Sequence, residues 1–263
     1  MKLNAHKNNI VGKVIAGTLI TLMMSVSASA EITSMQDAVN KAGKQRMITQ
    51  RMLKDYALIG MNNTYGNPQE DLPKMVTLFD TTLGELQAYV KDKSSLESLS
   101  KVAALWAPIK KSLQEAPAKD KVAALQRDLE ALLNAAHEST GLIAKASGSA
   151  AGEIVNTAGR QRMLSQRMAS LYMLKVWEID DPEFAAKLNT AMDEFAAAQK
   201  TLQASPLNTD EINALLAKSG KAFKFFQMMG KSKSNKFVPS LINRSANKIL
   251  TNMNTATGLY ASK

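Results

Sequence analysis

Apolar positions recur along the chain at the three- and four-residue spacing of amphipathic helices, and short polar or Gly- and Pro-containing breaks separate them. The pattern predicts an all-α fold of eight helices, four in each half of the chain. We expect them near residues 32–62, 69–92, 95–115, 119–146, 150–179, 182–203, 208–229 and 235–261. Because the breaks are short, each half is predicted to be a four-helix up-down-up-down bundle.

The boundary between the two bundles is expected at Ser147-Gly148-Ser149. The predicted organisation is therefore a leader over residues 1–30, a first helical module over 31–147 and a second over 148–263. The boundary is short and helix-forming residues flank it, which is also compatible with a single long helix running across it.

The leader has the features of a cleavable signal peptide. Basic residues precede an apolar stretch from Val14 to Val26, and Ala28-Ser29-Ala30 is an A-x-A cleavage site. The alternative is an uncleaved membrane anchor, but the stretch is short for a span, which needs about 20 residues. We expect cleavage after Ala30, export to the periplasm and no transmembrane segment in the mature chain.

A motif is repeated in the two halves. Val39 to Met52 recurs 116 residues later as Val155 to Met168, and the substitutions between the copies are conservative except at Lys41. Weaker matches follow, among them Trp106 with Phe223. Each repeat therefore spans more than a hundred residues.

The motif helix has two faces to bury. On a helical wheel, residues 39–59 have two stripes on nearly opposite sides. One stripe comprises Ile48, Met52, Tyr56 and Ile59, and the other comprises Val39, Gly43, Met47 and Gln50, with Arg46 at its edge. One stripe serves the helix's own bundle, so the other needs a second partner, for which the sister helix of the other repeat is the obvious candidate.

The second stripe carries chemistry suited to an anion. Gly43 allows a helix or a small ligand to approach the backbone closely, and Arg46 leans back toward it. A guanidinium beside bare backbone can hold a planar oxyanion with two parallel hydrogen bonds. The alternative is that the motif arginines are surface residues or partners of carboxylates on neighbouring helices, and the residues alone leave both interpretations open.

The segment from Ala158 to Arg167 resembles the signature of the PilJ/NarX-type sensor module, the periplasmic domain of nitrate and nitrite sensor kinases and of some chemoreceptors, including the type IV pilus transducer. The resemblance extends over both repeats. In nitrate sensors of this family the module is a four-helix bundle, and nitrate lies between two first helices at a dimer interface. By position, the resemblance implies ligand-binding roles for Gly43, Arg46, Gln50, Arg51, Gly159, Arg162, Gln166 and Arg167.

Unlike the receptors of the family, this protein is expected to have no kinase, HAMP or methyl-accepting region after the second repeat. The two motifs are therefore expected to form a pseudo-dimeric site within one chain, or the chain forms a homodimer.

These observations predict a periplasmic, sensor-like binding protein that captures a small oxyanion, with nitrate or nitrite as the first candidates. An envelope signalling or pilus protein is the expected partner. The alternative is a structural protein that partners a membrane chemoreceptor, sensor kinase or pilus component and uses the motif for helix packing. No enzyme is expected and no catalytic residue is assigned, because no acid–base pair or nucleophile is marked.

Composition narrows the possible metal sites, cofactors and partners. The chain has no cysteine, which excludes disulfides and thiolate metal sites. His137 is alone in the mature chain, so no metal site and no cofactor are expected, and the abundant methionines are interpreted as core fillers. The net charge of +10 suits an anion or acidic partner, although export argues against nucleic acid. A lysine run from Lys218 to Lys236 is either a docking surface or a solvated face.

Overall fold

The computed structural model describes residues 31–148, 150–230 and 238–263. All regular structure in these ranges is helical, as the sequence predicts. The helices are α1 (Met35–Gly60), α2 (Pro68–Tyr89), α3 (Lys93–Gln114), α4 (Val122–Ala146), α5 (Ala150–Val176), α6 (Phe184–Gln203), α7 (Asp210–Gly230) and α8 (Pro239–Ala261). The signal-peptide prediction falls on residues outside the described ranges and stays a prediction.

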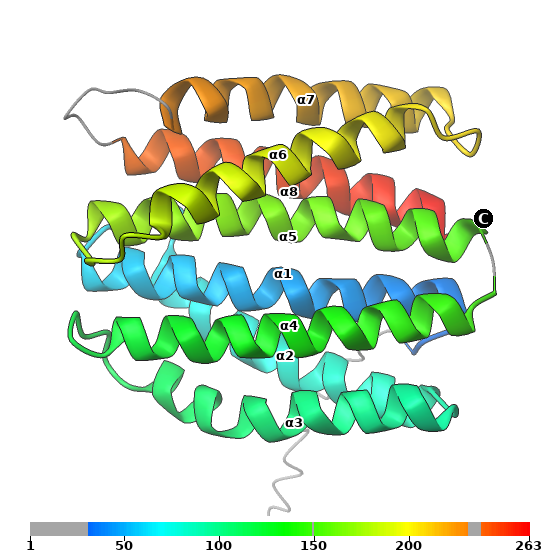
Figure 1. Cartoon of the computed structure of the whole chain (residues 1–263), viewed down its shortest axis with the longest axis horizontal. Coiled ribbons are helices and arrows are strands. Elements are labelled where there is room, and N and C mark those ends of the chain that lie inside the picture. Colours follow the sequence, from blue (N-terminus) through cyan, green and yellow to red (C-terminus); the bar gives the residue numbers. More distant parts are fainter. Residues whose placement is uncertain (1–30, 149, 231–237) are drawn as a thin grey trace, which may run out of the picture. The chain divides into compact units, whose positions relative to one another are not determined.

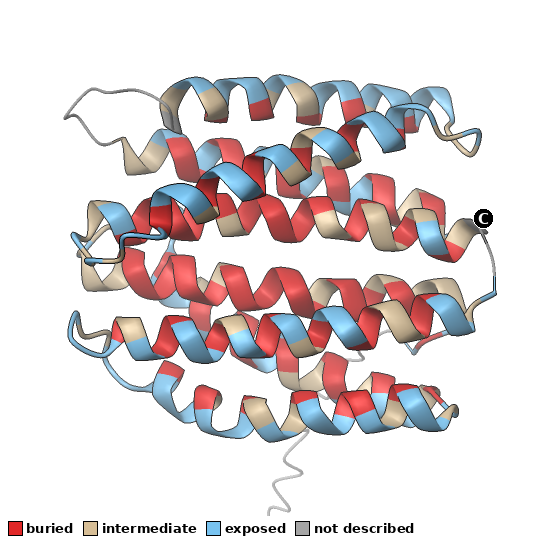
Figure 2. Ribbon diagram, in the orientation of Figure 1, coloured by how far each residue is buried: buried red, intermediate tan, exposed pale blue. Residues whose placement is uncertain are grey.

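The two motif helices, α1 and α5, lie side by side at the centre of the fold (Figure 1). Helix α1 also contacts α2 and α4, and α5 contacts α6 and α8, while α3 and α7 pack on the outer side of each group. Burial is concentrated on the two central helices (Figure 2). The prediction that the motif helices of the two repeats pack on each other is therefore confirmed.

The chain breaks its helical path between the two halves. Helix α4 ends at Ala146, Gly148 has a left-handed φ of 61°, and α5 begins at Ala150. A left-handed glycine terminates a helix, so the single continuous helix considered from the sequence is wrong. The seam between α1 and α5 joins the halves into one compact unit, and their separation into two modules stays a prediction.

Each half has the same aromatic contact in its core. Phe79 packs on Trp106 with ring centroids 4.3 Å apart, and Phe195 packs on Phe223 at the same 4.3 Å. Such tilted pairs contribute about 0.5–1.5 kcal/mol beyond burial. Trp106 and Phe223, which match weakly in the sequence, thus have the same packing role in the two halves.

Two tyrosines, Tyr56 and Tyr172, lie four residues after the two motif copies and bind the backbone at or just before the start of the fourth helix of each half. The hydroxyl of Tyr56 accepts a hydrogen bond from the backbone N–H of Ala118 (3.0 Å), and that of Tyr172 accepts one from Val238 (2.9 Å). None of the described helices is long and apolar enough to cross a membrane.

We expect Tyr56→Phe to lower the free energy of unfolding by about 1–2 kcal/mol, because the N–H of Ala118 loses its acceptor while the ring stays in place. Tyr89→Phe is the control, since Tyr89 also packs against the core; it should change stability by less than about 0.5 kcal/mol. Urea unfolding measures both, and equal effects would contradict this role of the Tyr56 hydroxyl.

Candidate ligand-binding site

The two central helices approach each other closely where each has its motif glycine. A Cβ placed on Gly43 would lie 3.8 Å from the Cα of Gly159, and a Cβ on Gly159 would lie 3.8 Å from the Cα of Gly43. The same added Cβ on either glycine would lie 3.1 Å from Nη2 of Arg162 and 3.3 Å from Nη2 of Arg46. Both guanidiniums therefore converge on the bare backbone at one crossing point.

Each arginine reaches across the seam to the opposite helix. Nη2 of Arg46 donates to the carbonyl oxygen of Asn156 at 3.1 Å, and Nη2 of Arg162 donates to that of Asn40 at 3.0 Å. Asn40 and Asn156 are the same position of the two motif copies. The contacts are reciprocal, so the seam has the internal symmetry that the repeat implies.

The fourth helix of each half, α4 or α8, supplies one more partner to one of the two arginines. Nη1 of Arg46 lies 3.1 Å from Nδ1 of His137 on α4, and Nη1 of Arg162 donates to Oδ1 of Asn254 on α8 at 3.3 Å. Arg162 also donates to Oδ1 of Asn40 at 2.8 Å. His137 and Asn254 hold equivalent places around the seam, and only His137 can titrate near neutral pH.

The seam buries two like charges without a carboxylate. Arg46 and Arg162 are both 0% exposed, and neither forms an ion pair with any acidic residue that the structure describes. Among the described residues, Nε of each arginine and Oδ1 of Asn156 are buried without a hydrogen-bond partner.

Burial lowers the pKa of Arg162 to about 9, and burial together with the neighbouring charge of Arg162 lowers the pKa of Arg46 to about 9. Both guanidiniums are therefore still charged at neutral pH, although the site is desolvated and its partners are neutral. A small anion would neutralise this charge.

The second arginine of each motif has a different environment. Nη2 of Arg51 lies 2.7 Å from Oδ1 of Asp71 on α2, and Nη1 of Arg167 lies 2.6 Å from Oε2 of Glu130 on α4. One of the two interpretations of the motif arginines from the sequence is that they pair with carboxylates on neighbouring helices. Arg51 and Arg167 form such ion pairs. A ligand role for Arg51 and Arg167 stays a prediction.

The motif glutamines lie one helical turn beyond the arginines. Oε1 of Gln50 accepts from the hydroxyl of Ser170 at 3.3 Å, and Oε1 of Gln166 accepts from Nζ of Lys54 at 3.1 Å. Lys54 and Ser170 are equivalent positions, so these contacts are again reciprocal. They bind α1 to α5 directly, and the assignment of the glutamines to a ligand stays a prediction.

The family model for the N-terminal domain of the type IV pili methyl-accepting chemotaxis transducer, PilJ, matches residues 28–135 and 143–217. The chain belongs to the PilJ family. The two matched segments each contain one motif copy, which is consistent with tandem copies of the domain. Comparisons with curated proteins and with solved structures give no match.

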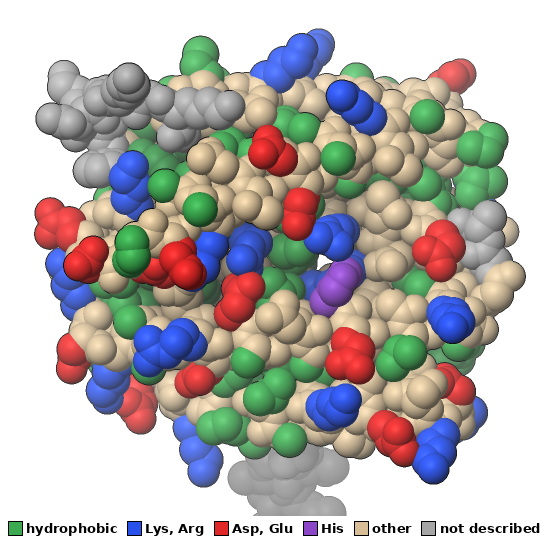
Figure 3. Space-filling view, viewed as in Figure 1, with side chains coloured by type: hydrophobic (Ala, Val, Ile, Leu, Met, Phe, Trp, Pro, Cys, Tyr) green, Lys and Arg blue, Asp and Glu red, His purple; other side chains and the backbone are tan. Residues whose placement is uncertain are grey.

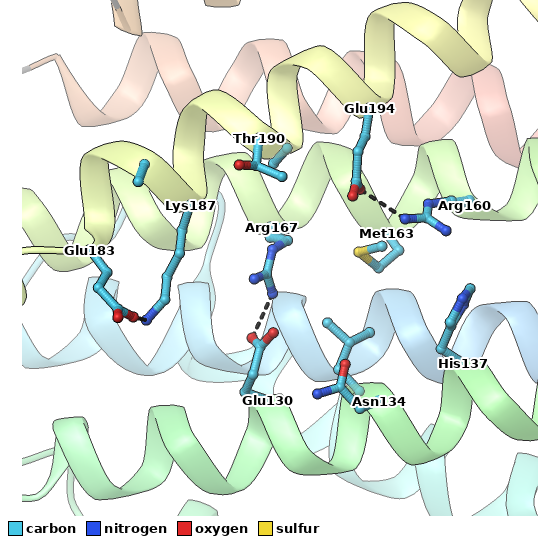
Figure 4. Close-up of a pocket in the computed structure, with 13 residues that line it drawn as sticks. Glu130, Asn134, His137, Arg160, Met163, Arg167, Glu183, Lys187, Thr190 and Glu194 are labelled. Atoms are coloured by element: carbon cyan, nitrogen blue, oxygen red, sulfur yellow. Dashed lines mark hydrogen bonds and ion pairs between the residues drawn. The ribbon is translucent and has the colours of Figure 1, made fainter.

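Beside the seam of this PilJ-family chain, the surface is hollowed between α4 and α6, over α5 (Figure 3). The groove has a volume of about 380 Å³, and Arg160, Met163 and Arg167 of α5 line its floor. Figure 4 shows Arg160 paired with Glu194 and Arg167 paired with Glu130 at its sides. His137 also lines this groove while its Nδ1 faces Arg46, so this side chain contacts both the groove and the seam.

Four polar residues at the site were missed in the sequence: Asn40, Asn156, His137 and Asn254. The two asparagines of the motif could have been found from their exact repetition, one turn before each glycine. The sequence suggests His137 only as a potential metal ligand, and its alignment with Asn254 is the signal that indicates its place at the seam. Among the described residues, no cluster of three potential metal ligands occurs.

We expect Gly43→Ala to disturb the site, because the new Cβ would lie 3.1 Å from Nη2 of Arg162 and must displace it. The matched control is Gly141→Ala in α4, where nothing lies within 4 Å of the added Cβ. Alanine is favoured over glycine in a helix by about 1 kcal/mol. The control should therefore gain up to that amount in chemical unfolding, and Gly43→Ala should gain nothing or lose stability. An equal gain in both variants would contradict the close approach.

Proposed function

We propose that this PilJ-family chain is a non-catalytic sensor module that binds a small oxyanion, nitrate or nitrite first, between α1 and α5 within one chain. The observation that supports the proposal is the pair of fully buried, charged guanidiniums at the Gly43–Gly159 crossing with only neutral partners. A buried charge without a counter-charge costs several kcal/mol. An anion held by both arginines would remove that cost and their mutual repulsion.

The geometry suits a small planar ligand. In the structure each guanidinium covers a glycine and donates to a backbone carbonyl of the opposite helix. Those carbonyls belong to Asn40 and Asn156 inside α1 and α5, so they also serve the helix backbone. An oxyanion can take their place as acceptor and use the unpartnered Nε groups. The ligand would thus change the contacts that hold α1 and α5 together.

A change in that seam is a means of signalling. Ligands shift a conformational equilibrium only as far as they bind its states differently. Here the bound and free states would differ in which acceptors the arginines use, and the seam is where the two halves meet. We propose that the module acts in the periplasm, after export, and passes this change to an envelope signalling or pilus protein.

A second candidate function is helix packing, and the reciprocal hydrogen bonds across the seam favour it. In that case the arginines bind α1 to α5, no anion is needed, and the module is an interaction partner. The two candidates differ in the response to added anions, since a packing role gives none.

Calorimetric titration of residues 31–263 with sodium nitrate and sodium nitrite tests the proposal. We expect saturable heat and a rise in melting temperature with at least one anion, because a ligand that binds only the folded state stabilises it. Arg46→Gln and Arg162→Gln should each weaken binding at least tenfold, as loss of a charge-assisted hydrogen bond is worth about 1.5–3 kcal/mol. Arg127→Gln is the control, since Arg127 is exposed on α4.

The absence of heat and of a melting shift with both anions would reject oxyanion binding. Loss of stability in Arg46→Gln and Arg162→Gln without any anion effect would favour the packing function instead. If Arg127→Gln weakened binding as strongly as the seam variants, the effect would be long-range electrostatics rather than direct contact.

The proposed site should bind its ligand more tightly at lower pH. In the free protein, partial burial and the charge of Arg46 lower the pKa of His137, so the imidazole is neutral and accepts from Arg46. A bound anion offsets the charge of Arg46 and raises that pKa, so binding takes up a proton. Nitrate affinity should therefore rise several-fold as the pH falls from about 8 to about 5.5.

His137→Asn gives the matched control for this pH dependence, because it copies Asn254 in the equivalent place. The variant should bind nitrate with an affinity that is flat over the same pH range. An unchanged pH profile in the variant would show that another group titrates.

A further inference from the structure

The C-terminal part of the chain has no acidic residues. From Ile212 to Lys263 the sequence contains eight lysines, one arginine and no aspartate or glutamate. This segment forms most of α7 and all of α8, which pack on each other at the outer edge of the fold (Figure 1). Five of these cations, Lys218, Lys221, Lys224, Arg244 and Lys248, lie on α7 and α8, with no acidic residue after Glu211 to offset them.

A groove runs between these helices on their outer side. It has a volume of about 680 Å³, and we call it the α7–α8 groove. Its principal lining residues are Lys218, Lys221 and Phe225 of α7 and Leu241, Arg244 and Lys248 of α8. None of its four cations forms an ion pair with a residue that the structure describes.

The lining residues of each helix are spaced so that they lie on one face of that helix. Residues 218, 221 and 225 follow an i, i+3, i+7 pattern on α7, and residues 241, 244 and 248 follow the same pattern on α8. The hydroxyl of Ser245 donates to the carbonyl of Ala222 at 2.7 Å, which fixes the register of the two helices. With that register, Phe225 and Leu241 share one end of the groove and the cations extend along the rest.

The apolar residues of this surface are unusually exposed. Phe225 is 37% exposed, Leu241 is 39% exposed, and Met228, one turn beyond Phe225, is 63% exposed. Large apolar side chains beside unpaired cations cost solvation and repulsion in the free protein, so their clustering indicates a contact surface.

The equivalent surface of the first half has only part of this character, since Lys101 and Arg127 stand at the positions of Lys218 and Arg244 but the other two cations are absent. The repeat offset that aligns Trp106 with Phe223 places Ala104 at the position of Lys221 and Ala131 at that of Lys248. It also places Asp128 at the position of Ser245, which introduces an acid. Helix packing therefore does not require Lys221 and Lys248, two of the four cations of the α7–α8 groove.

We propose that the α7–α8 groove is a docking site for an acidic amphipathic helix of a partner protein. Two helix faces with matching stripes form a concave seat for a third helix, which places its apolar ridge between them. Leu241 to Asn252 gives a contact of about 16 Å at 1.5 Å per residue, or roughly three turns. Acidic residues on both flanks of the bound helix would pair with Lys218, Lys221, Arg244 and Lys248.

This proposal does not depend on anion binding at the seam, because the groove residues are not among those that contact Arg46 or Arg162. Its failure would leave the proposed oxyanion function untouched. Likewise, failure of the oxyanion function would leave the proposed docking site untouched.

The test uses a fluorescein-labelled synthetic helix of about 18 residues, with leucines along one face at one end and glutamates on both flanks. We expect fluorescence anisotropy to show saturable binding to residues 31–263 in low-salt chloride buffer. The affinity should fall steeply with added salt. A scrambled peptide of the same composition should bind at least tenfold more weakly.

Two double variants locate the contact. Lys221→Glu with Arg244→Glu should weaken peptide binding at least tenfold. Lys101→Glu with Arg127→Glu, the same net change on the first half, should alter it less than twofold. Phe225→Ser should weaken binding without changing its salt dependence, because it removes apolar contact only.

Three results would overturn the proposal. The first is no saturable binding up to about 1 mM peptide, the limit of weak recognition. The second is equal binding of the scrambled and patterned peptides, or equal loss in both double variants. The third is binding of phosphatidylglycerol vesicles that displaces the peptide and is lost in Lys221→Glu with Arg244→Glu, which would identify a membrane surface as the occupant.

Discussion

The close approach of α1 and α5 at two glycines is the constraint on which the rest of the structure depends. Because neither Gly43 nor Gly159 has a side chain, the two backbones can come within contact distance. At that separation an arginine three residues further along either helix reaches the opposite backbone, and a glutamine one turn later reaches the opposite side chains. Larger residues at the crossing would separate the helices and break all of these contacts together.

Among the described residues, this packing leaves two buried positive charges without a negative partner. Arg51 and Arg167 each meet a carboxylate on an adjacent helix, so the fold can compensate a motif arginine. Arg46 and Arg162, which are more deeply buried, meet only carbonyls, amides and an imidazole. A purely structural seam would be more stable with apolar residues there, since buried charges rarely repay their desolvation. This electrostatic imbalance is the reason that we propose a ligand which supplies the missing charge.

The local pattern of the sequence was enough to predict the helices, the repeat and the contact between the motif helices. Two stripes on one helix demand two partners, and the repeat offers the second. The partners of individual arginines were not predictable in this way, because they depend on the register of distant helices. Whether Arg51 meets Asp71, or Arg46 meets His137, is set by how α2 and α4 slide along α1, and helical periodicity leaves that sliding undetermined. The helix ends shifted for a related reason: α6 begins at Phe184 and α7 at Asp210, about two residues inside the predicted ranges.

The two repeats have the same residues at the seam and different residues around it. The seam residues can therefore serve a function common to both halves, and the surrounding residues can serve a function of one half only. The glycines, arginines and asparagines of the seam are duplicated without change, so any function there needs both copies. Around the seam the symmetry fails: His137 stands where the other half has Asn254, and Lys221 of α7 and Lys248 of α8 stand where the first half has alanines. A symmetric dimer would repeat each of these features twice. One chain with two repeats can instead place a titratable neighbour on one side of a shared site and a basic docking face on only one of its bundles.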